Sequence, residues 1–231
     1  MRPQILSPID EYIRATWKVL GIVVAGSIMR GEGGPTSDLD IVVVHAELWR
    51  VRVQRRFDGV PAELFVNPPE RLRGYFEAEH ASGRPCTAHM LATGVVVAGA
   101  DPVVDELVRE AHAWLARPIE LTPAELAGKR YMAVDTLDDA RDLADVDPAM
   151  ASLLLATAVQ QIAAYAFWQR AMFQPRRKDL RRALAAIDPV AAEQVRAFTE
   201  ARGAAAHEVA QALARHVLGV DTFFEWTSDR S

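Results

Sequence analysis

The chain has 231 residues, of which 50% are hydrophobic and 25% charged, and its formal net charge is −5. These values are typical of globular proteins and exclude a disordered or fibrous chain. An acidic balance without a basic tail also argues against a protein that holds a long stretch of nucleic acid. Cys86 is the one cysteine, which excludes an intrachain disulfide.

The sequence gives no reason to expect a membrane or an export pathway. The first eight residues, Met-Arg-Pro-Gln-Ile-Leu-Ser-Pro, lack the apolar core of a signal peptide. The longest apolar stretch, 150–168, is interrupted by Gln160 and Gln161, so we do not expect it to span a bilayer. We therefore expect a cytoplasmic protein with no membrane partner.

The first part of the chain carries alternating helix and strand signals. Residues 8–20 place apolar side chains on one helical face, and the β-branched run that follows predicts a buried strand ending at Gly26–Ser27. A loop rich in glycine and proline covers 28–36. A second strand is predicted over 38–45.

A β-hairpin is predicted next, because strict alternation from Trp49 to Val66 is interrupted by Asp58–Gly59, a strong hairpin signal. The remaining elements of this part are a helix over 71–92 with a break near Gly83, a short strand over 95–98 and a helix over 101–115.

No strand signal remains after Pro118, where alanine and leucine dominate. Acidic or hydroxyl caps followed by proline, as in Thr122-Pro123, predict helix starts. The predicted helices cover 123–145, 148–173, 178–187 and 189–217, the last with a break at Gly203. We therefore predict an α+β protein: a small mixed β-sheet domain over 1–117, followed by an all-α helical bundle over 118–231.

The segment that suggests chemistry is Asp38-Leu39-Asp40. Side chains alternate along a strand, so the two carboxylates project from one face, about 6–7 Å apart. Two neighbouring carboxylates repel each other unless a cation lies between them, and Mg²⁺ prefers such oxygen ligands. Gly26 and Ser27 precede them and suit a phosphate, because glycine lets the backbone approach closely. On the hairpin, Glu63 faces away from Ala62 and Leu64, and it joins the aspartates if the two strands are neighbours.

These residues together resemble a known signature. Gly26-Ser27, a ten-residue spacer that ends with Ser37, the following Asp38-Leu39-Asp40-Ile41 and a later strand carboxylate are similar to the motif of the nucleotidyltransferase superfamily typified by DNA polymerase β. The likeness covers 21–66. The spacer and the helical second half resemble most, in layout, the antibiotic-modifying members: the kanamycin, streptomycin/spectinomycin and lincosamide nucleotidyltransferases.

The resemblance implies roles for individual residues. Asp38 and Asp40 would bind two Mg²⁺ ions, for which Mn²⁺ can substitute, and Gly26 and Ser27 would hold the triphosphate. Glu63 would complete the metal site or remove the proton from the attacking hydroxyl. The implied reaction is in-line attack of an acceptor hydroxyl on the α-phosphorus of a nucleoside triphosphate, with pyrophosphate leaving.

The expected activity is transfer of AMP from ATP to a hydroxyl of a small molecule. The layout extends this expectation to an aminoglycoside-like antibiotic and to antibiotic resistance, with the bundle closing the acceptor side from the same subunit or across a homodimer. Two alternatives stay open: a protein acceptor, as for antitoxin-like members, and a nucleotide-binding regulatory module without turnover. The bundle argues against the first, and the intact carboxylates argue against the second.

Three weaker signals remain. Ser37 either caps the turn before Asp38 or contacts the nucleotide. Lys178 belongs to a basic run that is either a solvated helix end or a nucleotide contact. Arg202 and His207 have the spacing of the ribonuclease motif of HEPN domains, although Gly203 stands where that motif has a polar residue.

Overall fold

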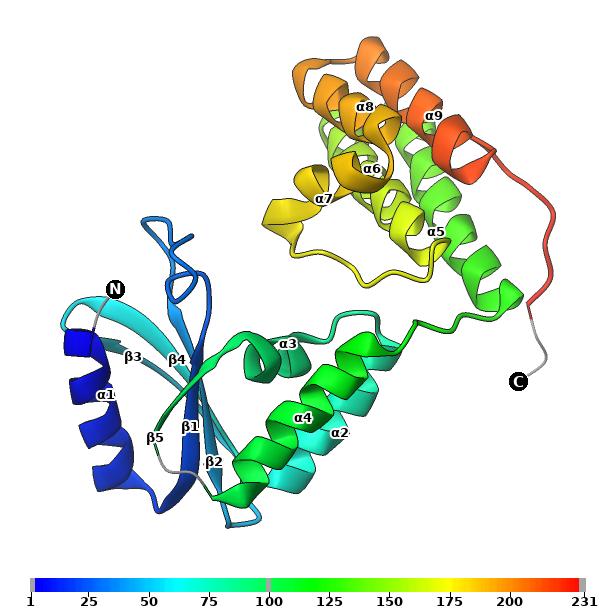
Figure 1. Cartoon of the computed structure of the whole chain (residues 1–231). Helices are drawn as coiled ribbons and strands as arrows, with labels where there is room; N and C mark the ends of the chain where they lie inside the picture. Colours follow the sequence, from blue (N-terminus) through cyan, green and yellow to red (C-terminus); the bar gives the residue numbers. More distant parts are fainter. Residues whose placement is uncertain (1–2, 99–100, 229–231) are drawn as a thin grey trace. The chain divides into compact units, whose positions relative to one another are not determined.

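The computed structural model describes residues 3–98 and 101–228, and its contacts divide the chain into two compact units, Met1–Pro118 and Ile119–Ser231. The predicted α+β class is confirmed: the first unit contains a mixed sheet with helices, and the second is helical (Figure 1). The assignment of 1–117 as the catalytic domain and of 118–231 as a bundle that closes its acceptor side stays a prediction. Each unit is described by itself.

The first unit contains five strands in the spatial order β3-β4-β2-β1-β5. The pair β2–β4 is parallel, and the pairs β1–β2, β1–β5 and β3–β4 are antiparallel. Its elements, in chain order, are α1 (Pro3–Thr16), β1 (Val19–Ala25), β2 (Leu39–His45), β3 (Val51–Phe57), β4 (Val60–Asn67), α2 (Pro69–Ala81), α3 (Cys86–Thr93), β5 (Val95–Ala98) and α4 (Pro102–Ala116).

Each face of this sheet is covered by helices, which explains why β1 and β2 are apolar on both sides. Ile9 and Ile13 of α1 pack with Leu39 and Ile41 on one face. The other face carries a second core, in which helices α2, α3 and α4 cover three buried valines: Val23, Val42 and Val44. The carboxylates described below lie on this second face, at the edge of the core.

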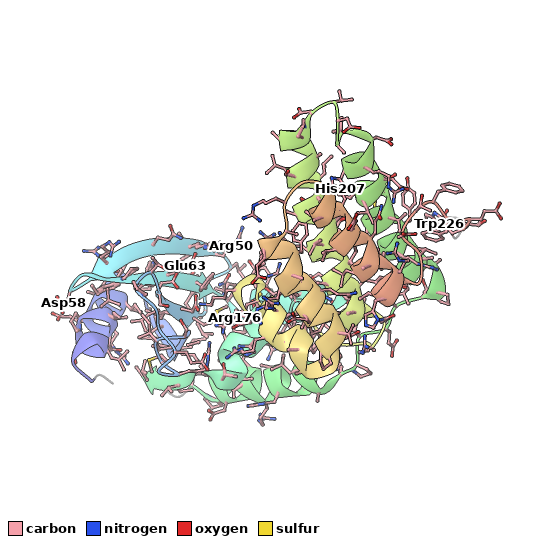
Figure 2. All side chains as sticks on the ribbon, turned by 90° about the horizontal axis from the view of Figure 1, so that it is seen from above. Arg50, Asp58, Glu63, Arg176, His207 and Trp226 are labelled. Atoms are coloured by element: carbon pink, nitrogen blue, oxygen red, sulfur yellow. The ribbon has the colours of Figure 1, made fainter. Side chains whose placement is uncertain are left out.

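The hairpin forms as predicted. Asp58 and Gly59 have φ values of 46° and 81°, the left-handed conformations that a tight two-residue hairpin turn requires. Asp58 lies at the tip, and Glu63 lies farther along the hairpin (Figure 2). The register pairs Gln54 with Glu63 and Arg52 with Phe65.

The second unit is a bundle around one apolar core. Proline follows the cap of α5, α6 and α8, and the capping box of Thr122 and Glu125 is present. Its elements are α5 (Pro123–Asp142), α6 (Pro148–Trp168), the 3-10 helix η1 (Arg177–Asp179), α7 (Leu180–Ile187), α8 (Pro189–Glu200) and α9 (Ala204–Leu218).

Helix α6 is, among the described residues, the one helix long and apolar enough by length and composition to cross a membrane. Half of its apolar window is buried inside the unit, where Leu155, Ala158 and Ile162 join the bundle core. This placement is the one expected for the central helix of a bundle.

Several predicted boundaries are wrong. Helix α1 begins at Pro3 and not at Pro8, which lies inside it, and it ends at Thr16. Helix α6 ends at Trp168, five residues early, because the chain turns at Ala171, where φ is 52°.

Candidate metal centre

The two aspartates flank Leu39, the first residue of β2. Leu39 between them is fully buried on the α1 face, so Asp38 and Asp40 project from the opposite face. Both aspartates are half-buried. The sequence Asp-Leu-Asp-Ile produces this arrangement directly, since one apolar side chain anchors the strand while its neighbours remain at the surface.

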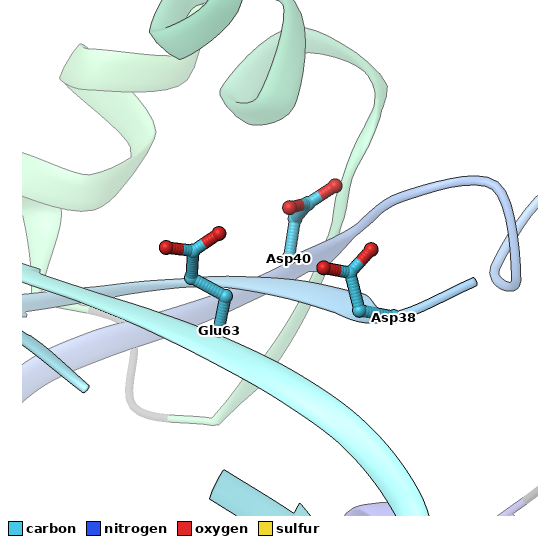
Figure 3. Close-up of side chains that lie close together, drawn as sticks. All are labelled: Asp38, Asp40 and Glu63. Carbon is cyan, nitrogen blue, oxygen red and sulfur yellow. The ribbon is translucent and has the colours of Figure 1, made fainter. Parts of the chain in front are cut away.

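Glu63 reaches the same place from β4. The parallel register pairs Asp40 with Glu63, and the carboxylates of Asp38, Asp40 and Glu63 project on the same side of the strands (Figure 3). One oxygen from each lies within 4.8 Å of the other two, and Glu63 is 7% exposed. Strands β2 and β4 therefore hold a cluster of three carboxylates, in which Asp40 and Glu63 are neighbours although 23 positions separate them in the sequence.

Such a cluster is electrostatically costly by itself. Like charges at this distance disfavour the ionised state of each other, and burial of Glu63 adds a desolvation cost. One compensating charge comes from the protein: the Arg52 guanidinium of β3 forms an ion pair with Glu63. Arg52 also lies over the Phe65 ring, 5.1 Å from its centroid, which fixes it on this face of the hairpin.

The donor set fits a hard divalent cation. All three side chains offer carboxylate oxygens, the ligands that Mg²⁺ and Mn²⁺ prefer, and their spacing lets one ion contact all three. No histidine or thiol belongs to the group, so the ligand chemistry does not favour a zinc site.

Gly26 forms a cradle beside the cluster. Its φ of +99° is a conformation that residues with a side chain rarely adopt. A Cβ at this position would lie 3.1 Å from Asp40 Oδ2 and 3.2 Å from the Asp38 carbonyl oxygen. The turn after β1 therefore runs close against both aspartates, in a conformation that favours glycine.

Ser27 and Ser37 close the loop between β1 and β2. The Ser27 hydroxyl donates to Ser37 Oγ at 3.1 Å, and the Gly34 amide donates to the same Oγ at 2.8 Å. Ser37 thus ties both ends of the loop together next to Asp38. These hydrogen bonds give Ser37 a structural role in the loop, and its contact with a nucleotide stays a prediction.

The remaining predicted residues lie in the second unit. Lys178 is exposed in η1, and its nucleotide contact stays a prediction. Arg202 is not on a helix: it lies in the break between α8 and α9, and its guanidinium donates to the carbonyls of Thr199 and Ala201. His207 lies in the first turns of α9 (Figure 2). The predicted break at Gly203 is therefore present, and it separates Arg202 from the helix that carries His207.

Sequence reasoning missed the polar row of β3. Arg52, Gln54 and Arg56 are paired with Phe65, Glu63 and Pro61, so they share the face of the carboxylates. The alternation of the hairpin contained this signal, because residues an even number of positions from Gln54 share its face. Without knowing that β4 neighbours β2, nothing connected that face to the aspartates.

Part of the chain is similar to a known family of domains. Residues 6–70 match a family model described as a nucleotidyltransferase domain. A solved structure of a nucleotidyltransferase-like protein from Exiguobacterium sibiricum 255-15 is similar, with a TM-score of 0.54 and 12% identity over 94% of this chain and 74% of that one. At this identity the likeness concerns the fold alone. No curated protein matches the chain.

Proposed function

We propose that the protein transfers AMP from ATP to a hydroxyl of a small molecule, because residues 6–70 match the model of a nucleotidyltransferase domain. The observation that carries the proposal is the cluster of Asp38, Asp40 and Glu63, whose oxygens lie within 4.8 Å of one another on two neighbouring strands. A structural role would not require three acidic side chains to gather at the edge of an apolar core.

Mg²⁺ is the cofactor that this cluster supports best, with Mn²⁺ as a substitute. Asp38, Asp40 and Glu63 would hold it. When bound, it supplies positive charge to the phosphate oxygens and to the group that leaves. The carboxylates in turn gain the counter-charge that their close spacing demands.

The residues around the cluster supply positioning. The turn at Gly26 brings main-chain atoms against the aspartates, where backbone amides and the Ser27 hydroxyl suit a triphosphate. The acceptor oxygen forms a bond to the α-phosphorus, and the bond from that phosphorus to the bridging oxygen breaks. Its electron pair leaves with pyrophosphate, and the hydroxyl proton passes to a carboxylate, for which Glu63 is the candidate.

The acceptor is a small hydroxyl compound in this proposal, and aminoglycoside-like antibiotics belong to that class. Its cellular setting would be the cytoplasm, where ATP and Mg²⁺ are both supplied. Fixed charge and orientation provide most of the acceleration in such reactions, so the carboxylates are the residues on which activity depends.

The test is incubation of the full chain with labelled nucleoside triphosphates, Mg²⁺ and a panel of hydroxyl compounds, followed by mass spectrometry. We expect one compound to gain the mass of a nucleoside monophosphate and pyrophosphate to appear in equal amount. The double variant Asp38→Asn/Asp40→Asn is the control and should show neither. An equal gain with this variant, or no affinity of the native chain for Mg²⁺ and any nucleoside triphosphate, would exclude the proposal.

A further inference from the structure

A hollow opens beside the carboxylates on the hairpin side. Its volume is about 390 Å³, and its walls include Asp38 and Glu63 together with Gln54, Arg55 and Arg56 of β3. This volume lies at the lower end of the range for small-molecule sites. The hollow therefore joins the candidate metal centre to an arginine-rich strand.

The sheet order separates this hollow from the Gly26 turn. That turn follows β1, the hollow lies over β4 and β3, and the β2 aspartates stand between them in the order β3-β4-β2-β1. Strands in a sheet are about 4.8 Å apart, so Arg56 of β3 stands about 10 Å from the β2 row. A triphosphate held at Gly26–Ser27 would approach the carboxylates from one side and leave the hollow to the acceptor.

Arg56 differs from Arg52 and Arg55, the other arginines of β3, in the group that its guanidinium contacts. The Arg52 guanidinium is matched by the Glu63 carboxylate, and the Arg55 guanidinium lies 4.4 Å over the Tyr12 ring, on the α1 face. Arg56 Nη1 donates to the Gly59 carbonyl oxygen at 2.9 Å, which orients the group without neutralising its charge. The register places Arg56 opposite Pro61, on the face of Glu63.

Together with the proposed function, on which this step rests, these observations indicate that the acceptor is negatively charged. We propose that the hollow is the acceptor subsite and takes a small hydroxyl compound that also carries a phosphate or carboxylate, with Arg56 binding that anion. A guanidinium binds such groups through two parallel hydrogen bonds and repels ammonium groups. Within the class of small hydroxyl acceptors, this inference therefore favours anionic compounds over aminoglycoside-like polycations. The Gln54 carboxamide, opposite Glu63, adds a neutral donor and acceptor between the anion and the carboxylates.

The inference is tested on the full chain with three sugars that differ in charge: glucose 6-phosphate, glucose and glucosamine. Each is titrated into protein saturated with Mg²⁺ and a non-hydrolysable ATP analogue. We expect glucose 6-phosphate to bind at least tenfold more tightly than the other two, and Arg56→Ala to remove at least tenfold of that affinity. Arg14→Ala is the matched control, because Arg14 pairs with Asp10 on α1, which covers the opposite face.

Separate readouts distinguish this inference from the proposed function. Affinity for Mg²⁺ and the ATP analogue is measured first, and Arg56→Ala should leave it within about twofold. If the nucleotide binds but glucosamine or glucose binds as well as glucose 6-phosphate, or if Arg56→Ala and Arg14→Ala behave alike, the anionic subsite is wrong while the proposed function stands. Nucleotide transfer to the 3′ hydroxyl of an RNA oligonucleotide, with no transfer to a sugar phosphate, would overturn the proposal that the acceptor is a small molecule.

Discussion

Gly26 follows β1 and lies so near Asp40 that a side chain on this glycine would crowd the aspartate. A Cβ added to Gly26 would lie 3.1 Å from Asp40 Oδ2 and 3.3 Å from the Asp40 amide nitrogen. The second of these neighbours is backbone and cannot swing away. The position of the carboxylate is thus tied to the absence of a side chain on the preceding turn.

Gly26→Ala should therefore damage both stability and the metal site. The φ of +99° adds backbone strain of about 1–3 kcal/mol for any residue with a side chain, and the new methyl group displaces Asp40. We expect a lower melting temperature and at least tenfold weaker Mg²⁺ binding, measured by calorimetry.

The chain offers a matched control for strain alone. Gly59 has a φ of +81°, and a Cβ there would meet nothing within 4 Å. Gly59→Ala should lose stability similarly but keep its Mg²⁺ affinity. Equal losses of Mg²⁺ affinity in the two variants would mean that the contact between Gly26 and Asp40 has no bearing on the site.

Asp40→Asn should stabilise the metal-free protein. The substitution removes one of three carboxylates that lie within 4.8 Å of one another, and relief of about 1 kcal/mol corresponds to a rise of a few degrees in the melting temperature of this unit. Adding Mg²⁺ should raise the melting temperature of the native chain and not that of the variant, because a ligand stabilises the state that binds it.

Glu77→Gln, on the exposed face of α2, is the control for the loss of a negative charge and should show neither effect. A metal-free Asp40→Asn protein that melts below the native chain, yet still gains stability from Mg²⁺, would show that the cluster is not a metal centre.

The sequence predicted those features that depend on neighbouring residues. Asp58-Gly59 defined the hairpin because both residues tolerate positive φ, and the caps of α5, α6 and α8 defined helix starts because each satisfies free amides. The start of α1 was missed since proline usually marks the first turn of a helix, whereas Pro8 lies inside this one.

The pairing of β2 with β4, which are not consecutive in the chain, could not be predicted from the sequence. Alternation placed Glu63 on the face opposite Leu64, but only the parallel register of β2 and β4 brings it beside Asp40. The nearness of Arg52 and Arg56 to the aspartates depends on the same strand order, which no local pattern specifies. The aspartates were found because they are two residues apart.

Residues 1–118 should fold alone. Both cores of the first unit consist of its own side chains, from Ile9 to Ala111, and the bundle core consists of residues from Ala133 onward. We expect the isolated fragment to melt cooperatively, within a few degrees of one transition of the full chain, when followed by circular dichroism. A fragment with random-coil chemical shifts would contradict the division into two independently stable units.

Acid should destabilise the first unit through His45. This ring is 1% exposed and contacts the Trp49 ring, and burial lowers the pKa of His45 below 6.5 despite the opposing effects of the Trp49 backbone and Glu47. The unfolded chain therefore takes up this proton first, so stability falls as the pH drops below about 6.5 and stops falling below the folded pKa.

The measurement compares unfolding free energy against pH for the native chain and His45→Phe, which keeps an aromatic ring. Burial raises the pKa of Glu79, which acts in the opposite direction, so the difference between the two curves isolates the histidine. The variant should lose less stability between pH 7.5 and 5.5. Parallel curves over that window would rule out a buried neutral imidazole.

Arg52 should oppose metal binding while supporting the metal-free fold. Its guanidinium forms an ion pair with Glu63, whose side chain is 9% exposed, whereas the Arg52 side chain is 59% exposed. A cation entering the cluster must share the Glu63 carboxylate with this guanidinium. The guanidinium also repels the cation, which at a separation of about 7 Å costs about 1 kcal/mol of binding free energy, or about fivefold in affinity. Arg52→Ala should therefore bind Mg²⁺ several-fold more tightly than the native chain. Without Mg²⁺ the same variant should melt at a lower temperature, because Glu63 then remains buried beside two aspartates without its counter-charge.

Two variants serve as controls. Arg52→Lys keeps the charge and should stay close to the native chain in both measurements, and Arg14→Ala, on α1, should match the native chain. Weaker Mg²⁺ binding in Arg52→Ala would show instead that the arginine holds Glu63 in the position that the ion requires.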